Sequence, residues 1–370
     1  MRTNELDYRL PPQHIATEPA QPRDAARLMV VRRDSGTIEH RQVRDLAGLP
    51  GLFGAQDLLV FNQTRVLPAY FTGLRRGTGG KVTGLFLRAP GPRVWQVLLE
   101  ARGRLGPGDN IELSDGAYLE LTGRGEEGAE AGGAPGVPGA GGAVWTAALH
   151  SQEDTLTLLG QIGAAPLPPY IRRQRRALHQ AELRPEDAAR YNTVYAVDPG
   201  SVAAPTAGLH FTAELLRALD AQGVRRRSLT LHVGLGTFAP VRSDNLEDHA
   251  MHAESYTVPE ATLAALRCAR AAGGRIIPIG TTTVRALESL PDPLPGAGDV
   301  AGETRLLIAP GFTFRFADGL MTNFHLPRST LLALVAALPG VGIERLLGWY
   351  RVAVAEGYRF YSYGDAMLIL

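Results

Sequence analysis

The segment between residues 66 and 160 constrains the fold most, because short apolar stretches alternate there with Gly/Pro turns. Residues 82–87, 95–99 and 118–121 are three such stretches, and residues 106–109 have the composition of a turn. Short strands separated regularly by turns predict a small β-barrel or sandwich. Because the pattern on either side is mixed α/β, we expect this unit to be inserted into a second domain.

The flanking segments predict a mixed α/β core domain to which both ends of the chain contribute. We expect strands at residues 26–33, 57–61, 228–233, 275–280, 306–308 and 366–370, and helices at 259–272, 281–288, 329–338 and 343–356. The predicted core domain therefore consists of residues 1–65 and 161–370, with a barrel-like domain of residues 66–160 between its two parts. The second part of the core domain holds most of the candidate site residues.

Residues 123–143 are a low-complexity run of glycine, alanine, proline and glutamate. Such a segment cannot bury enough apolar surface to order itself. We expect a disordered and dispensable loop within the β-domain.

Composition excludes several classes of function. A net charge of +1 over 370 residues gives no global field that would attract nucleic acid or a membrane. Cys268 is the only cysteine, which rules out an internal disulfide framework, a cysteine-rich zinc site and an iron–sulfur cluster held by this chain alone. The N-terminus has no apolar signal region and no apolar run reaches about 18 residues, so we expect a cytoplasmic protein without a membrane partner. No dinucleotide-binding or P-loop glycine pattern follows a predicted strand.

A histidine at the end of a small-residue loop is the clearest single candidate for chemistry. Residues 200–211 are small, apolar and hydroxyl-bearing up to His210, and Thr212 then has the position of a helix N-cap. Such a loop can bring an imidazole close to a substrate. A loop histidine is more often structural than catalytic, so this pattern alone leaves the role of His210 open.

Other segments combine polar groups with an equally simple structural explanation. The glycines and hydroxyls at residues 234–238 and 280–285 fit an anion site or a plain turn. His249 and His252 fit a metal site or an acid–base role, and we favour the latter because no third ligand is evident. Residues 321–330 fit a substrate loop or a helix cap. The tyrosines of residues 358–363 could stack on bases or dock on the core, and the arginine runs at 172–176 and 225–227 suit phosphate or solvent.

Taken together, nine segments resemble one family, the S-adenosylmethionine:tRNA ribosyltransferase-isomerases of the queuosine pathway. They occur in the family's order and span nearly the whole chain. The segments are residues 57–69 (DLLVFNQTRVLPA), 166–172 (PLPPYIR), 191–196 (YNTVYA), 200–212 (GSVAAPTAGLHFT), 229–241 (LTLHVGLGTFAPV), His252 with Glu254, 279–289 (IGTTTVRALES), 322–332 (TNFHLPRSTLL) and 358–367 (YRFYSYGDAM). Departures from the family pattern are Gln63, Tyr70, where arginine is usual, and the insert at 123–143.

The resemblance implies a reaction in which S-adenosylmethionine donates its ribosyl group to 7-aminomethyl-7-deazaguanine at the wobble position of a tRNA. The products would be epoxyqueuosine-tRNA, adenine and methionine. The sulfonium acidifies the C5′ protons, so the chemistry needs a base, an acid for adenine and a neutral amine, but no metal and no further cofactor.

The resemblance also implies which residues form the site. The candidates for proton transfer are His210, His252, His325, Glu254 and Asp365. Candidates for binding the substrates are Thr206, Gly208, Gly236, Thr237, Thr282, Arg285, Asn323, Arg328 and Tyr361, of which Arg285 and Arg328 could bind phosphate or the methionine carboxylate. Candidates for binding tRNA are Arg65, Arg172, Arg173 and Arg175. We expect a monomer.

Two alternatives belong to other functional classes. A tRNA methyltransferase outside the Rossmann fold would use the same donor but release S-adenosylhomocysteine. A non-catalytic tRNA-binding protein would consume no donor and would bind with strong salt dependence.

Overall fold

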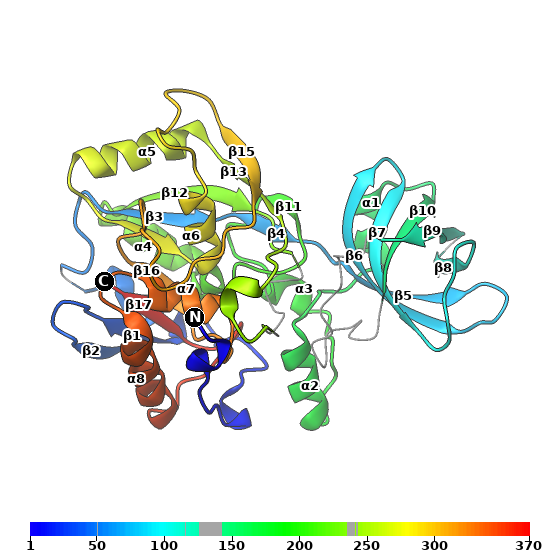
Figure 1. The fold of residues 1–370 in the computed structure, drawn as a ribbon, viewed down its shortest axis with the longest axis horizontal. Coiled ribbons are helices and arrows are strands. Elements are labelled where there is room, and N and C mark those ends of the chain that lie inside the picture. The colour runs from blue at the N-terminus through cyan, green and yellow to red at the C-terminus, as the bar shows by residue number, and fades with distance from the viewer. Residues whose placement is uncertain (50, 115, 126–142, 235–240, 242) are drawn as a thin grey trace.

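The computed structural model describes residues 1–49, 51–114, 116–125, 143–234, 241 and 243–370. It contains two bodies that lie side by side, a large α/β domain and a small β-barrel joined by extended segments (Figure 1). The predicted fold class, a mixed α/β core with an inserted all-β unit, is therefore confirmed.

A nine-stranded mixed sheet forms the centre of the large domain, in the order β15-β13-β12-β3-β14-β16-β17-β1-β2. Its strands are β1 (Arg27–Val31), β2 (Ile38–Gln42), β3 (Leu58–Asn62), β12 (Arg225–Leu231), β13 (Glu254–Val258), β14 (Ile276–Ile279), β15 (Val300–Thr304), β16 (Leu320–Asn323) and β17 (Ala366–Ile369). Strands β12, β3, β14 and β16 run parallel to one another. The carboxyl ends of these four strands therefore lie at one edge, which is where open α/β sheets bind ligands.

Helices cover both faces of this sheet (Figure 1). On one face, α4 (Ala213–Ala221) packs with the alternate residues Leu59 and Phe61 of β3. On the other face lie α5 (Glu260–Ala271), α6 (Thr281–Glu288), α7 (Thr330–Ala337) and α8 (Gly342–Ala355). All five residues of β3 are buried, as expected for a strand covered on both sides.

Capping side chains begin the helices near the site. The Thr212 side chain accepts a hydrogen bond from the backbone N–H of Leu215 in α4, and the Ser329 side chain accepts one from Leu332 in α7. The N-cap at Thr212 and a helix starting at Ser329 were both predicted from the sequence.

The inserted unit is a closed barrel in the order β10-β7-β6-β5-β8-β9, with every neighbouring pair antiparallel. Its strands are β5 (Tyr70–Arg75), β6 (Lys81–Gly91), β7 (Val94–Ala101), β8 (Asn110–Ser114), β9 (Ala117–Arg124) and β10 (Ala143–His150). Helix α1 (Thr155–Ile162) contributes Leu158 and Leu159 to the barrel core. Most of the segment predicted as a disordered loop, residues 126–142, lies outside the described residues.

Short elements connect the two bodies. Strands β4 (Thr64–Val66) and β11 (Asp198–Ser201) form a separate parallel pair. Helices α2 (Pro169–Ala177) and α3 (Asp187–Arg190) lie between the barrel and the sheet in Figure 1. The 3-10 turns η1 (Thr3–Leu6), η2 (Pro12–His14), η3 (Arg23–Ala25), η4 (Val43–Ala47), η5 (Thr206–His210) and η7 (Leu246–Asp248) complete the described elements.

One predicted strand is wrong. Residues 306–308 are irregular, and the strand in this region is β15, which pairs with β13 just before them. The Thr304 side chain accepts the backbone N–H of Leu306, whose carbonyl in turn accepts from the Arg285 guanidinium. The backbone groups of Leu306 are therefore already bonded outside any sheet.

Within the described ranges, no single helix has the length and hydropathy needed to span a membrane. Helices α7 and α8 meet that criterion only as a pair, and they are bent by 111° relative to each other.

Candidate active site

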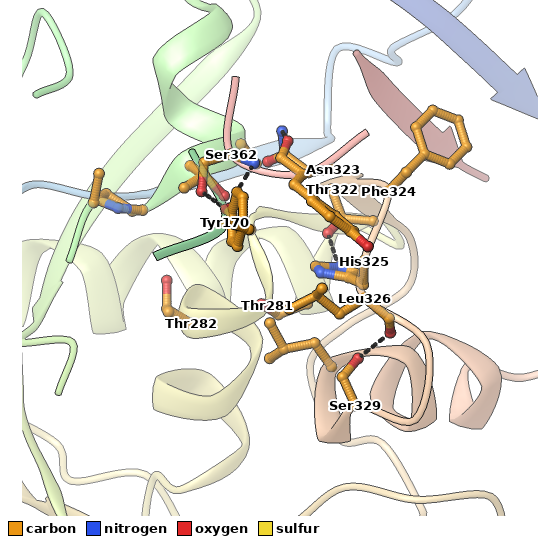
Figure 2. A pocket seen from close by; sticks show the side chains of 17 residues that line it. Tyr170, Thr281, Thr282, Thr322, Asn323, Phe324, His325, Leu326, Ser329 and Ser362 are labelled. Atoms are coloured by element: carbon orange, nitrogen blue, oxygen red, sulfur yellow. Dashed lines mark hydrogen bonds between the residues drawn. The ribbon is translucent and has the colours of Figure 1, made fainter. Parts of the chain in front are cut away.

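A pocket opens at the carboxyl ends of β14 and β16, where five of the family-like segments meet (Figure 2). Ala204–Ala207 span the start of η5, Gly280–Thr282 span the start of α6, and Thr322–Leu326 span the end of β16. Tyr361 and Ser362 come from the segment before β17. The pocket therefore joins parts of the chain that are far apart in sequence. Of the predicted substrate-binding residues, Thr206, Thr282, Asn323 and Tyr361 line it, together with His325.

A glycine turn connects β14 to α6 at the floor of this pocket. Gly280 has a φ of 96°, a conformation that favours glycine, and α6 has no side-chain cap. The first N–H groups of a helix have no partner within the helix, so those of Thr281 and Thr282 stay available to a ligand. The Thr282 hydroxyl accepts a 3.2 Å hydrogen bond from Asn62, which orients it from behind.

Asn323 brings a buried amide to the pocket. Its Nδ2 donates to the carbonyl oxygen of Tyr361 at 3.0 Å, which fixes the orientation of the amide. The side chain is 2% exposed, and its Oδ1 has no hydrogen-bond partner among the described residues. Tyr361 itself has a φ of 72°, an uncommon conformation for a residue with a side chain. Backbone strain of this kind is concentrated at functional sites.

His325 is the only candidate proton-transfer residue that lines the pocket within the described residues. Its Nε2 lies 2.7 Å from the Thr322 hydroxyl, and its backbone N–H donates to the Tyr350 hydroxyl at 2.9 Å. Burial lowers the pKa of His325 to about 3. The ring is therefore neutral at physiological pH.

Sequence reasoning missed a tyrosine–serine pair on the opposite wall. The hydroxyl of Tyr170 in α2 bonds the side chain of Ser362, and the Ser362 backbone N–H also donates to Tyr170 at 3.2 Å (Figure 2). Burial raises the pKa of Tyr170, so its hydroxyl stays protonated. Both residues lie within family-like segments, and that was the only sequence signal for them.

His210 and Asp365 lie behind the pocket in supporting positions. The His210 ring nitrogens lie 3.0 Å from the carbonyl oxygens of Ala207 and Gly364, so the ring joins η5 to the segment before β17. Burial lowers the pKa of His210, whereas the two carbonyls favour its charged form. Asp365 accepts the backbone N–H groups of Arg27 and Arg359 at 3.0 and 2.8 Å. These contacts give Asp365 a structural role rather than a position at the pocket.

A buried ion pair lies beside the site, between Glu254 at the start of β13 and Arg285 in α6. Glu254 also accepts the backbone N–H of Gly234 at 3.0 Å, and Arg285 donates to the carbonyl of Leu306 at 3.0 Å. His252 is half-buried in a non-helical segment. The pKa of the nearby His249 is lowered mainly by burial and to a smaller extent by the proximity of His252. The predicted site residues Gly236 and Thr237 lie outside the described residues.

Two more predicted substrate-binding residues have other contacts. Gly208 serves packing, since a Cβ at this position would lie 2.0 Å from the hydroxyl of Tyr195. Arg328 has a φ of 53° and pairs with Asp7 at the surface, outside the pocket lining. Among the described residues, no three His, Cys, Asp or Glu side chains gather as metal ligands would.

The predicted tRNA-binding arginines divide into exposed and buried ones. Arg65 and Arg173 are exposed, while Arg172 lies over the ring of Tyr70 at 4.6 Å and pairs with Glu182. Tyr70 thus positions a guanidinium although it replaces the arginine usual in the family. The tRNA contact predicted for Arg175 is wrong, because this side chain is fully buried and makes two hydrogen bonds of 2.6 and 2.8 Å to Asp187.

Comparison with known proteins agrees with this geometry. The family model described as "queuosine biosynthesis protein" matches residues 3–369. The S-adenosylmethionine:tRNA ribosyltransferase-isomerase of Moorella thermoacetica is 46% identical over 372 residues and covers both chains fully. A protein of the same name from Thermus thermophilus is 48% identical over 375 residues and covers 98% of each chain. A crystal structure of the S-adenosylmethionine tRNA ribosyltransferase from Thermotoga maritima is similar with 32% identity and a TM-score of 0.52, and covers 99% of this chain and 100% of its own. The resemblance found in the sequence motifs is confirmed, and the chain belongs to the queuosine biosynthesis protein family.

Proposed function

We propose that this chain transfers and isomerises the ribosyl group of S-adenosylmethionine onto 7-aminomethyl-7-deazaguanine at the wobble position of a tRNA. The products are epoxyqueuosine-tRNA, adenine and methionine. S-adenosylmethionine acts as a co-substrate, and the reaction uses no further cofactor. Because the acceptor is a tRNA, the reaction takes place in the cytoplasm. A single protomer carries it out.

The observation that carries this proposal is the full-length similarity to relatives named for this reaction, at 46% and 48% identity. These names support ribosyl transfer over the alternatives of methyl transfer or simple tRNA binding. The convergence of the shared segments on one pocket supports an enzyme, since a binding protein needs no such constellation.

The proposed chemistry begins with removal of a C5′ proton beside the sulfonium. His325 is the group proposed to accept it, because its ring lines the pocket and no residue in the described part of the chain hydrogen-bonds its Nδ1. The Thr322 hydroxyl holds Nε2 and so orients the ring. His210 and Asp365 act as positioning residues that fix the two loops forming the pocket walls. His252 and the Glu254–Arg285 pair are proposed to contact the donor from beside the pocket.

The proposed tRNA surface contains Arg65, Arg172 and Arg173, which lie on β4 and α2 between the two bodies. The aminomethyl-deazaguanine must leave the base stack to reach the pocket, and a single-stranded anticodon loop allows this at low cost.

The test is a product assay. Purified protein is incubated with S-adenosylmethionine and tRNA carrying 7-aminomethyl-7-deazaguanine, and adenine, methionine and S-adenosylhomocysteine are separated chromatographically. We expect adenine and methionine in equal amounts, and only with the modified tRNA. Formation of S-adenosylhomocysteine would show methyl transfer, and no turnover by folded protein would leave only tRNA binding.

A further inference from the structure

The described lining of the pocket carries no formal charge at neutral pH. It contains no Asp, Glu, Lys or Arg, and burial keeps His325 neutral and the hydroxyls of Tyr170 and Tyr361 protonated. Burying an ammonium group among such side chains is costly, because no opposite charge compensates for the lost water. The lining therefore suits an uncharged ring with polar edges better than the amino-acid end of S-adenosylmethionine.

Asn323 supplies one specific requirement for that ring. Its Oδ1 is a buried acceptor that no residue in the described part of the chain bonds, and the bond from Nδ2 to Tyr361 prevents the amide from turning over. An unsatisfied buried acceptor is destabilising, so the ligand must offer a donor at this point. Ligand rings with an exocyclic amino group meet this requirement.

The start of α6 supplies the complementary groups. Within the described ranges, no side chain caps the first backbone N–H groups of α6, those of Thr281 and Thr282, and the helix dipole gives this end a partial positive charge. These donors suit the ring nitrogens of a purine, which are acceptors. One pocket thus combines an acceptor on Asn323 with donors at a helix N-terminus.

Resting on the proposed function, we infer that this pocket holds the adenine of S-adenosylmethionine, with Asn323 Oδ1 accepting from its 6-amino group and the first N–H groups of α6 donating to its ring nitrogens. The same N–H groups assist the departure of adenine. When the C1′–N9 bond breaks, its electron pair remains on N9, and the negative charge lies next to the positive end of α6 until adenine takes up a proton. The reaction thus removes one proton from C5′ and adds one proton to the departing adenine, so that no net proton is gained or lost.

The first experiment needs no mutation. Dissociation constants are measured by calorimetry for S-adenosylmethionine and for S-inosylmethionine, in which an oxygen acceptor replaces the 6-amino group. Because two acceptors would then face each other, the wild type should bind the inosine analogue roughly 10- to 100-fold more weakly. Equal affinity for the two ligands would overturn the inference.

Asn323→Leu assigns that discrimination to one atom. The variant should bind S-adenosylmethionine more weakly and retain a preference for it of no more than about threefold, because the reading group is gone. Asn110→Leu in the barrel is the matched control and should keep the wild-type preference. If Asn323→Leu instead weakens only ligands that carry the methionine α-amino group, measured against a desamino analogue, the pocket holds the amino acid and the inference is wrong.

Two substitutions at one position test the helix. Thr281→Pro removes the first N–H of α6 at a position where helices tolerate proline, whereas Thr281→Val removes only the hydroxyl. Adenine release in a single turnover should slow by at least about tenfold more in Thr281→Pro than in Thr281→Val, with circular dichroism confirming that both are folded. Equal rates would refute the role of the helix.

These outcomes separate the two proposals. If the wild type releases adenine and methionine but binds S-adenosylmethionine and S-inosylmethionine equally well, only the placement of adenine is refuted. A folded wild type that releases neither product refutes the proposed function itself.

Discussion

His325 should make the stability of the core domain depend on pH. Burial lowers the pKa of this ring from its ordinary value of 6.5 to about 3, so the unfolded chain binds the proton more readily than the folded one. The stabilisation is therefore complete above about pH 6.5 and is lost as the pH falls toward 3. Each pH unit is worth about 1.4 kcal/mol, so acidification from pH 7.5 to pH 5 should cost about 2 kcal/mol through this residue.

The assay is urea unfolding followed by circular dichroism at about pH 7.5 and about pH 5. His325→Gln keeps a neutral polar side chain near Thr322 but cannot titrate, so the variant should lose about 2 kcal/mol less than the wild type on acidification. His179→Gln alters an exposed histidine and should follow the wild type. Parallel pH dependence of His325→Gln and the wild type would refute the reasoning.

The remaining predictions concern charges, packing and the insert. Arg173→Met should reduce the salt dependence of tRNA affinity by about one counterion. Arg175→Met should lower the free energy of unfolding by about 3–5 kcal/mol, because it leaves the buried carboxylate of Asp187 without its positively charged partner. Salt titrations and urea unfolding distinguish the two. Glu254→Gln should lower the free energy of unfolding, measured in urea, by a similar amount, because it leaves the buried guanidinium of Arg285 without the negative charge that compensates it. Gly200→Ala places a Cβ 2.7 Å from the ring of His232 and should lower the melting temperature. Deletion of residues 126–142 should leave adenine release unchanged, and a loss of activity would show that the insert has a function.

Local sequence patterns predicted a helix or strand correctly where the residues of that element alone carry the signal. Thr212 and Ser329 have the side chain and spacing of N-caps, and both cap their helices. The alternating short strands after residue 66 predicted the barrel because each strand buries one face. Residues 306–308 were misassigned, because tertiary hydrogen bonds from Thr304 and Arg285 compete there with a sheet.

The site was predictable as a set of segments but not as a set of roles. The motifs identified Asn323 and His325 correctly as neighbours, since Asn323 ends β16 and His325 follows it. Nothing local distinguishes Arg175, which is buried, from the exposed Arg173 two residues before it, because only the position of Asp187 in α3 decides this. Similarly, the use of Asp365 as an acceptor for backbone N–H groups depends on where β1 lies in the sheet.

The position of β17 has a consequence for how the protein is made. Residues 366–369 form an interior strand between β16 and β1, so the large sheet joins one of the first strands to be synthesised to the last. The barrel, in contrast, uses one continuous stretch and can fold while the ribosome is still translating the rest. During that interval β1 and β2 must wait with an unpaired edge, and this nascent state is the one most exposed to aggregation and to chaperones.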